Sequence, residues 1–392
     1  MTDGRESPPR IRAAPPPEGA VLDRLTLNRA LLARQWLLEP VGLPVAAAIE
    51  HLVGMQAQVP TDPYLSLRAR LGEFAPADLE ALILDRSAVR LALFRGTLHL
   101  ATARDALGIR PLMQDLATRA FRASPFARRL AGAEVEDIVR AGSELLEARP
   151  RSLTELGAAL RARWPDHDAE AMAYAVRILV PFVQVPPRGL WHRTSAPRIA
   201  GLTTWLAGVA APRIPIATVV RRYLAAFGPS TAADIRAWSG LRSLTGTLAG
   251  LRDGLRVYRD EAGRELLDTP DGEFGAEDGP PPIRFLGEYD NVFLAHADRS
   301  RITGDVRWGP AWARKRAFFV DGFLAGAWHI RATSRGSLLT IQPAIALSPS
   351  GRDEVAAEAR AAARFGADAE AGEEVAVRWE SMGPPCRASR SG

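Results

Sequence analysis

The sequence predicts an α+β fold in which tandem winged-helix motifs precede a C-terminal β-rich domain. Helix-periodic segments, each followed by a short hairpin pattern, recur three times before residue 270. From Pro280 onward, apolar and polar residues alternate around Asp-Gly and Gly turns. The length of 392 residues suffices for two or three packed units of this kind.

The first predicted winged-helix unit covers residues 20–130. Leucines at helical spacing predict a helix over 25–38 that Pro40 stops, and a second helix over 45–57 follows Pro44. A third helix is expected over 75–86. The segment 89–101 changes to strand periodicity around Arg95-Gly96, which predicts a hairpin with an Arg-Gly turn.

The same order recurs in a second unit, 131–212, and a third, 213–270. In the second, helices begin at Leu153 and span 169–184, and a hairpin is expected over 183–194 around a Pro-Pro-Arg-Gly turn. In the third, a helix from Ile216 precedes a break at Gly228-Pro229, and Ser230 or Thr231 caps a helix that ends near Gly240. Two strands over 255–267 complete it.

A β-rich domain is predicted over 283–380, after an acidic, Pro/Gly-rich linker at 271–282. Its expected strands are 283–295, 316–330, 337–347 and 373–379, with one helix over 352–366. The Pro- and Arg-rich segment 1–19 and the polar segment 381–392 are predicted to be disordered.

Composition excludes several kinds of site. The single Cys386 excludes an intrachain disulfide framework and a thiolate zinc site, and the six histidines lack metal-ligand spacing. The chain has no phosphate-binding loop, no dinucleotide fingerprint and no Gly-x-Ser-x-Gly elbow. We therefore expect no metal and no cofactor. Without a signal peptide or a membrane-spanning segment, a cytoplasmic location is expected.

The charge pattern leaves two interpretations open. The net charge is +5, and Lys315 is the only lysine among 50 basic residues. Codon bias in a GC-rich genome is one explanation. The other is that arginine suits phosphate binding and stacking on bases.

The most unusual polar element is Gln56-Ala57-Gln58, which Pro60 and Pro63 follow. Two primary amides on one surface supply both acceptors and donors, and so can orient a water molecule and stabilise developing charge. By itself such a pair is most often a solvated or capping pair.

Five blocks in order carry a family resemblance: LVGMQAQVPTDPYLSLRARLGEF, RGTLHLATARD, VQVPPRGLWHR, VVRRYLAAFGPSTAADIRAWSGL and LGEYDNVFLAHADRSRI. Over about Leu25 to Trp379 the chain resembles the winged-helix DNA glycosylases of bacteria typified by AlkZ and YcaQ. The resemblance implies a concave channel for duplex DNA. Gln56-Ala57-Gln58 is similar to the family's Gln-x-Gln signature rather than to its Gln-x-Asp form, although Ala57 is smaller than the usual middle residue.

What the resemblance implies is a monofunctional glycosylase that excises bulky N7- or N3-alkylated purines from duplex DNA, including interstrand crosslinks. The biological role would be base excision repair or self-resistance to a genotoxin. Gln58 would position the water molecule and Gln56 would support its geometry. The expected DNA contacts are Tyr64, Arg68, Arg95, His99, Arg188, His296, Arg299 and Arg301, the last three on a hairpin that probes the groove.

Structural roles compete with several of these contacts. Core packing is the alternative for Tyr64, a structural wing position is the alternative for His99, and surface pairing with Asp290 or Asp298 is the alternative for the hairpin. A DNA-binding regulator without catalysis, or a protein that sequesters damaged DNA, would have a similar sequence. No dimerisation helix is evident, so we expect a monomer.

Overall fold

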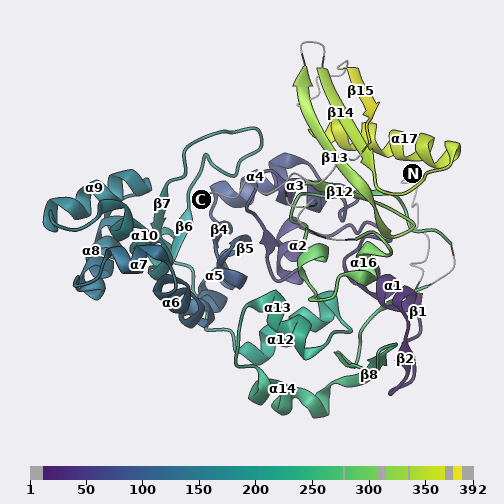
Figure 1. The fold of residues 1–392 in the computed structure, drawn as a ribbon, viewed down its shortest axis with the longest axis horizontal. Coiled ribbons are helices and arrows are strands. Elements are labelled where there is room, and N and C mark those ends of the chain that lie inside the picture. The colour runs from purple at the N-terminus through teal and green to yellow at the C-terminus, as the bar shows by residue number, and fades with distance from the viewer. Residues whose placement is uncertain are drawn as a thin grey trace, which may run out of the picture.

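The computed structural model describes residues 12–276, 279–307, 309, 312, 314–333, 336–366 and 374–381. At its centre lies an antiparallel sheet of five strands in the order β3-β5-β4-β6-β7 (Figure 1). The strands are β3 (Met55–Gln56), β5 (Leu98–Thr102), β4 (Ala88–Ala92), β6 (Phe182–Gln184) and β7 (Ile199–Gly201). The hairpins expected in the first two units therefore supply strands to a single sheet.

Four helices come first in the chain, and the last three of them pack beside this sheet. They are α1 (Arg24–Arg34), α2 (Val45–His51), α3 (Asp62–Arg68) and α4 (Pro76–Leu84). The helices predicted over 25–38 and 75–86 are confirmed, with shorter ends. The helix predicted over 45–57 is wrong beyond His51, because Gly54 adopts φ 87° and Met55-Gln56 continue as β3.

Helix α5 packs on the central sheet, and helices α6 to α10 form a lobe with its own core, seen at the left of Figure 1. They are α5 (Ala103–Ile109), α6 (Gln114–Arg122), α7 (Pro125–Arg129), α8 (Val135–Ala148), α9 (Leu153–Arg163) and α10 (Ala169–Leu179). Ser152 and Glu155 form a capping box that fixes the predicted start of α9. The helix predicted over 169–184 ends at Leu179, and the strand expected to return within 183–194 begins only at Ile199.

The segment 202–268 agrees well with its sequence pattern. Its elements are α11 (Leu202–Trp205), α12 (Ile216–Phe227), α13 (Ala232–Ser239), α14 (Thr245–Leu251), β8 (Arg256–Asp260) and β9 (Glu265–Asp268). Thr231 caps α13, and Gly240 ends it in the left-handed conformation at φ 76°. Strand β2 (Val21–Leu22) adds to the β8–β9 hairpin.

A second five-stranded sheet forms the C-terminal part, at the top of Figure 1, in the order β11-β12-β13-β14-β15. Its strands are β11 (Arg284–Phe285), β12 (Arg316–Val320), β13 (Phe323–Thr333), β14 (Gly336–Pro343) and β15 (Glu374–Trp379). Helix α17 (Pro349–Gly366) packs on it through Val355 and Ala359. The predicted C-terminal β-sheet is thus confirmed.

Two predictions in this part are wrong. The strand expected over 283–295 is the short β11 followed by helix α15 (Asn291–Leu294). The probe hairpin expected around residues 296–302 is replaced by helix α16 (Ser300–Thr303). Both changes follow from buried polar contacts made by this segment, described below.

The predicted linker and leader are partly ordered. Strand β10 (Phe274–Gly275) lies inside the predicted linker and pairs with β1 (Arg12–Ala13) from the predicted leader. Residues 1–11 of that leader, and 382–392 of the predicted disordered C-terminal segment, lie outside the described residues. The domain boundaries stay predictions. Within the described chain, no helix has the length and apolarity needed to cross a membrane.

Candidate active site

The β4–β5 hairpin ends in a tight turn at the predicted Arg95-Gly96. Arg95 has φ 57° and Gly96 φ 72°, and the amide of Thr97 donates to the carbonyl of Phe94 at 3.1 Å. Two left-handed central residues with this hydrogen bond make a type I′ turn, which normally favours Asn-Gly or Gly-Gly. An arginine at such a position carries backbone strain, a feature that clusters at functional sites.

Helix α13 anchors the turn. The Phe94 ring packs on Trp238 with centroids 4.1 Å apart, and Arg95 Nη1 donates to the Trp238 carbonyl. A Cβ atom at Gly240 would lie 3.0 Å from the Arg95 Cα, so only glycine permits this approach. The Arg95 guanidinium is thereby held in place beside β3.

Gln56 lies under this guanidinium and is 7% exposed. Its Oε1 accepts from Arg95 Nη2 at 2.9 Å and from Thr97 Oγ1 at 3.2 Å. The side-chain carbonyl is therefore fully engaged, and the amide NH₂ is the end not used by these two bonds.

Gln58 differs because its side chain is exposed and, among the described residues, has no hydrogen-bond partner. It lines a pocket of about 200 Å³ between the central sheet and helices α6 and α10. The pocket, called the cationic pocket below, is lined by Gln58, Ala92, Leu93, Arg95, Gly96, Leu98, Arg110, Met113, Leu116, Ala117, Ala120, Tyr174, Arg177, Ile178 and Phe182.

The cationic pocket contains three arginines and, within the part of the chain that is described, no Asp or Glu. Burial lowers the pKa of Arg95 to about 10, helped by the nearby charge of Arg299, and burial alone lowers the pKa of Arg110 to about 10. Both remain protonated at neutral pH. Burial and the Arg95 charge lower the pKa of His99 to about 3, so this histidine is neutral.

The comparisons with known proteins agree with the resemblance. The family model "DNA glycosylase AlkZ-like" matches residues 49–365. The chain belongs to the AlkZ-like DNA glycosylase family. Among solved structures, the Streptomyces sahachiroi DNA glycosylase AlkZ matches with a TM-score of 0.65 and 20% identity, over 91% of this chain and 99% of that one. No curated protein sequence matches.

Other residues expected at the DNA interface of this AlkZ-like chain lie in structural contacts. Tyr64 is fully buried and donates to the Gly189 carbonyl at 2.8 Å. Arg68 pairs with Glu358 on α17 at 2.8 Å. Arg188 donates to the Ser195 carbonyl at 2.8 Å within the loop between β6 and β7. His99 is 3% exposed and its Nδ1 lies 2.9 Å from the Thr97 carbonyl.

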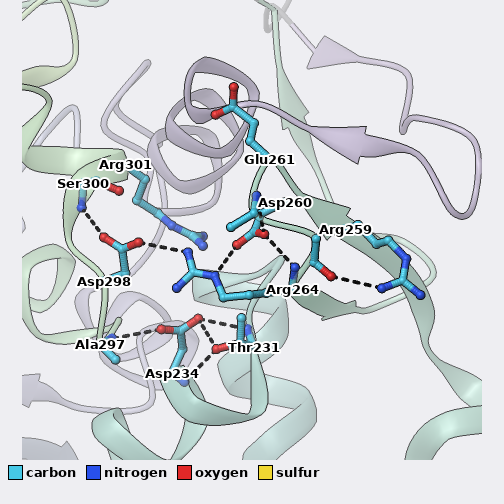
Figure 2. A network of polar contacts seen from close by, with 12 residues as sticks. Thr231, Asp234, Arg259, Asp260, Glu261, Arg264, Ala297, Asp298, Ser300 and Arg301 are labelled. Atoms are coloured by element: carbon cyan, nitrogen blue, oxygen red, sulfur yellow. Dashed lines mark hydrogen bonds and ion pairs between the residues drawn. The ribbon is translucent and has the colours of Figure 1, made fainter.

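The three residues expected on a probe hairpin are placed around α16 instead. His296 is 2% exposed and contacts the Phe227 carbonyl, and Arg301 is 7% exposed and donates to the Pro229 carbonyl. Arg299 is half-buried and donates from Nε to the Phe293 carbonyl at 2.5 Å. Figure 2 shows the Arg301 side chain beside that of Arg264, which pairs with Asp298.

The contacts in Figure 2 explain why this segment is helical. Asp298 accepts from the Ser300 amide at 3.0 Å and from Arg264 at 2.9 Å, and Asp234 accepts from the Ala297 amide at 2.9 Å. These bonds tie the segment to β8–β9 and α13. His296 and Arg301 therefore support the fold in this structure. The Arg299 charge, in contrast, acts on Arg95 and helps to lower the pKa of that guanidinium.

Sequence reasoning missed Arg110, Tyr174 and Arg177. Arg110 lies near the end of the first predicted unit, and Tyr174 and Arg177 lie on α10 in the second, so these residues meet Gln58 only through tertiary packing. Their one sequence signal is position: Tyr174 and Arg177 are three residues apart on one helix and so share a face. Within the described residues, no group of three or more His, Cys, Asp or Glu is arranged to hold a metal ion.

Proposed function

We propose that this chain is a monofunctional DNA glycosylase that hydrolyses the N-glycosidic bond of N7- or N3-alkylated purines in duplex DNA, bulky adducts and interstrand crosslinks included. The biological role would be base excision repair or self-resistance to a genotoxin. The supporting observation is the cationic pocket beside Gln58, which combines an unpartnered amide with three arginines and no carboxylate among the described residues.

The absence of a carboxylate in that lining favours a substrate that needs no general acid. An alkyl group on N7 or N3 gives the purine a formal positive charge, so the base leaves as a neutral molecule without protonation. A carboxylic acid that protonates the leaving group, as in glycoside hydrolases, is then unnecessary.

The arginines suit the DNA backbone rather than the reacting sugar. A guanidinium binds phosphate oxygens through paired hydrogen bonds, and such contacts fix the register of a protein on duplex DNA. Phosphates held by Arg95, Arg110 and Arg177 would also offset the cationic charge of the pocket, which otherwise opposes an oxocarbenium-like sugar.

The two glutamines would have different roles in the reaction. Gln58 projects into the pocket with both ends of its amide available and would place the attacking water molecule. Gln56 would hold the geometry, because its carbonyl links β3 to the hairpin turn through Arg95 and Thr97.

A lyase reaction through a Schiff base is not part of the proposal. That chemistry requires an amine, and the only lysine, Lys315, contacts Gln342 of β14 at 3.4 Å. Neither residue lines the cationic pocket.

The test measures base release under single-turnover conditions, with mass spectrometry of the free base from an N7-alkylguanine duplex. Removing one well-placed polar group costs about 100- to 1,000-fold in rate, so Gln58→Ala should lose activity on that scale. Gln56→Ala should lose less, because it acts by holding other groups. Gln342→Ala on the C-terminal sheet serves as the control and should match the wild type.

Two results would contradict the proposal. Wild-type rates in both Gln56→Ala and Gln58→Ala would remove the pair from the mechanism. Tight binding of the alkylated duplex by the wild-type protein without any free base would indicate sequestration or regulation instead.

A further inference from the structure

The sequence block 286–302 ends in the three residues that were expected to probe DNA, and its first half lies against the strand that carries Gln56. This half runs from Leu286 to Leu294 and includes Asp290, the N-cap of α15. It comes from a part of the chain more than 200 residues away from the Gln pair, and none of its side chains belongs to the cationic pocket. Its contacts with the β3 strand are made by Asn291, to backbone groups of Gly54 and Gln56.

Strand β3 lies at the edge of the sheet, since β5 is its one neighbour among the strands that the structure describes. An edge strand leaves peptide groups without a strand neighbour. Asn291 supplies that neighbour: its Nδ2 donates to the Gly54 carbonyl at 2.8 Å, and its Oδ1 accepts from the Gln56 amide at 3.0 Å. One side-chain amide therefore takes the place of a peptide group of a further strand.

Asn291 is itself rigidly placed by its neighbour Asp290. Arg70 donates to the two oxygens of this carboxylate at 2.8 and 2.7 Å, and Ser66 Oγ donates at 2.7 Å. Burial pushes the pKa of Asp290 up, but the Arg70 charge and these hydrogen bonds outweigh it and hold the pKa below its usual value. The carboxylate also accepts from the Val292 amide at 3.1 Å, which starts α15.

The other side of the motif is fixed from within the sheet. Arg90 Nη2 donates to the Ala57 carbonyl at 2.6 Å, and the Ala57 amide donates to the Leu98 carbonyl at 2.8 Å. Without Asn291, the Gly54 carbonyl and the Gln56 amide would be the unheld edge of this strand.

We propose that Asn291 is a positioning residue for the Gln56-Ala57-Gln58 motif, acting through the backbone of β3 and held by the Arg70–Asp290 ion pair. This inference rests on the proposed glycosylase function. It gives the segment 286–294 a catalytic purpose that requires no contact with DNA.

The test is the single-turnover rate of base release by Asn291→Ala. A displacement of about 1 Å at a reacting group costs up to about 100-fold in rate, so a loss of that order is expected. Affinity for the alkylated duplex should be unchanged, because Asn291 lies outside the cationic pocket. A reduced rate at constant affinity separates positioning from loss of the binding surface.

Asn28 provides a matched control. It is a buried asparagine whose Nδ2 also donates to two backbone carbonyls, those of Arg301 at 2.7 Å and Gly322 at 2.9 Å. Asn28→Ala should lower the melting temperature but leave the rate of the folded protein unchanged. Equal rates for Asn28→Ala and Asn291→Ala, both measured well below their melting temperatures, would overturn the inference.

Asn291→Asp keeps the inference testable if the alanine variant fails to fold. The Asp carboxylate retains the acceptor for the Gln56 amide but loses the donor to the Gly54 carbonyl, and protonation restores that donor. The rate of Asn291→Asp relative to wild type should therefore rise as the pH falls, and a flat ratio would contradict the role. If the wild-type protein releases no base, the proposed function fails instead, whatever these variants do.

Discussion

Two groups of arginines in two regions of the molecule differ in their partners. In the first region, Arg34 pairs with Asp268 at 2.6 Å and Arg70 pairs with Asp290 at 2.7 Å, all four side chains at most 1% exposed. We call these two pairs the Arg–Asp scaffold. In the second region, the cationic pocket, Arg95, Arg110 and Arg177 line a cavity without a carboxylate among the described residues.

The difference shows that the partner of an arginine, rather than the number of arginines, marks the candidate site. The charge of a scaffold arginine is compensated by a buried carboxylate, so that arginine is not available to bind an anionic ligand. An arginine of the pocket keeps its charge for an anion. The almost exclusive use of arginine is consistent with codon bias, but three arginines line the same pocket as Gln58.

The largest effect is expected from breaking the Arg–Asp scaffold. Asp268→Asn keeps the shape of the side chain but leaves the Arg34 charge buried and uncompensated, which should lower the free energy of unfolding by about 3–5 kcal/mol. Urea unfolding followed by circular dichroism measures it.

The control is a pair on the surface. Arg252 and Glu265 are 52% and 40% exposed, so Glu265→Gln should leave the urea midpoint nearly unchanged. Equal shifts for the two variants would show that the buried pair is not what stabilises this region.

A smaller effect is expected from His99, which follows Leu98 of the cationic pocket along β5. Its pKa falls from 6.5 to about 3 through burial and the Arg95 charge, so the unfolded chain binds a proton at this site between these pH values and the folded chain does not. Proton uptake by the unfolded chain favours unfolding. The free energy of unfolding therefore keeps its full value, as far as His99 is concerned, above pH 6.5 and falls by about 1.4 kcal/mol per pH unit as the pH falls toward 3.

The measurement is the free energy of unfolding between pH 5 and 7.5. His99→Gln should give a shallower fall on the acid side than wild type, whereas substitution of the exposed His329 on β13 should not. An unchanged slope in His99→Gln would mean that His99 titrates normally in the folded protein.

Much of the fold could be predicted from local signals. The capping box at Ser152 and Glu155, the left-handed Gly240 and the Arg95-Gly96 turn each place an element end through interactions within four residues. The predicted ends of helices and strands were wrong where contacts with residues far away in the sequence determine the backbone conformation. The helix over 45–57 stops because Met55-Gln56 pair with β5, and the alternating segment 283–295 turns helical where Asp290 meets Arg70.

The candidate site, like the fold, was predicted only in part from the sequence. The sequence identified Gln56, Gln58 and Arg95, which the structure brings together, with Arg95 directly bonded to Gln56. It assigned His296 and Arg301 to DNA because the family resemblance implied a probe hairpin at this segment, whereas both side chains are buried. It missed Asn291, although the residue stands in one of the quoted blocks, because backbone hydrogen bonds from a side chain 235 positions away leave no periodic pattern.

The smallest effect separates the two kinds of arginine at the DNA interface. Each phosphate contact adds about 0.9 to the slope of log affinity against log salt, so Arg177→Ala should reduce that slope by about 1 and weaken binding at low salt most. Arg68 is the matched control: its charge already pairs with Glu358, so Arg68→Ala should leave the slope unchanged. Fluorescence anisotropy on one alkylated duplex at several salt concentrations measures both. If Arg68→Ala lowers the slope and Arg177→Ala does not, paired arginines bind the DNA backbone and the cationic pocket does not. In that case the absence of a carboxylate partner would not identify the arginines that bind DNA, even if the glutamines prove catalytic.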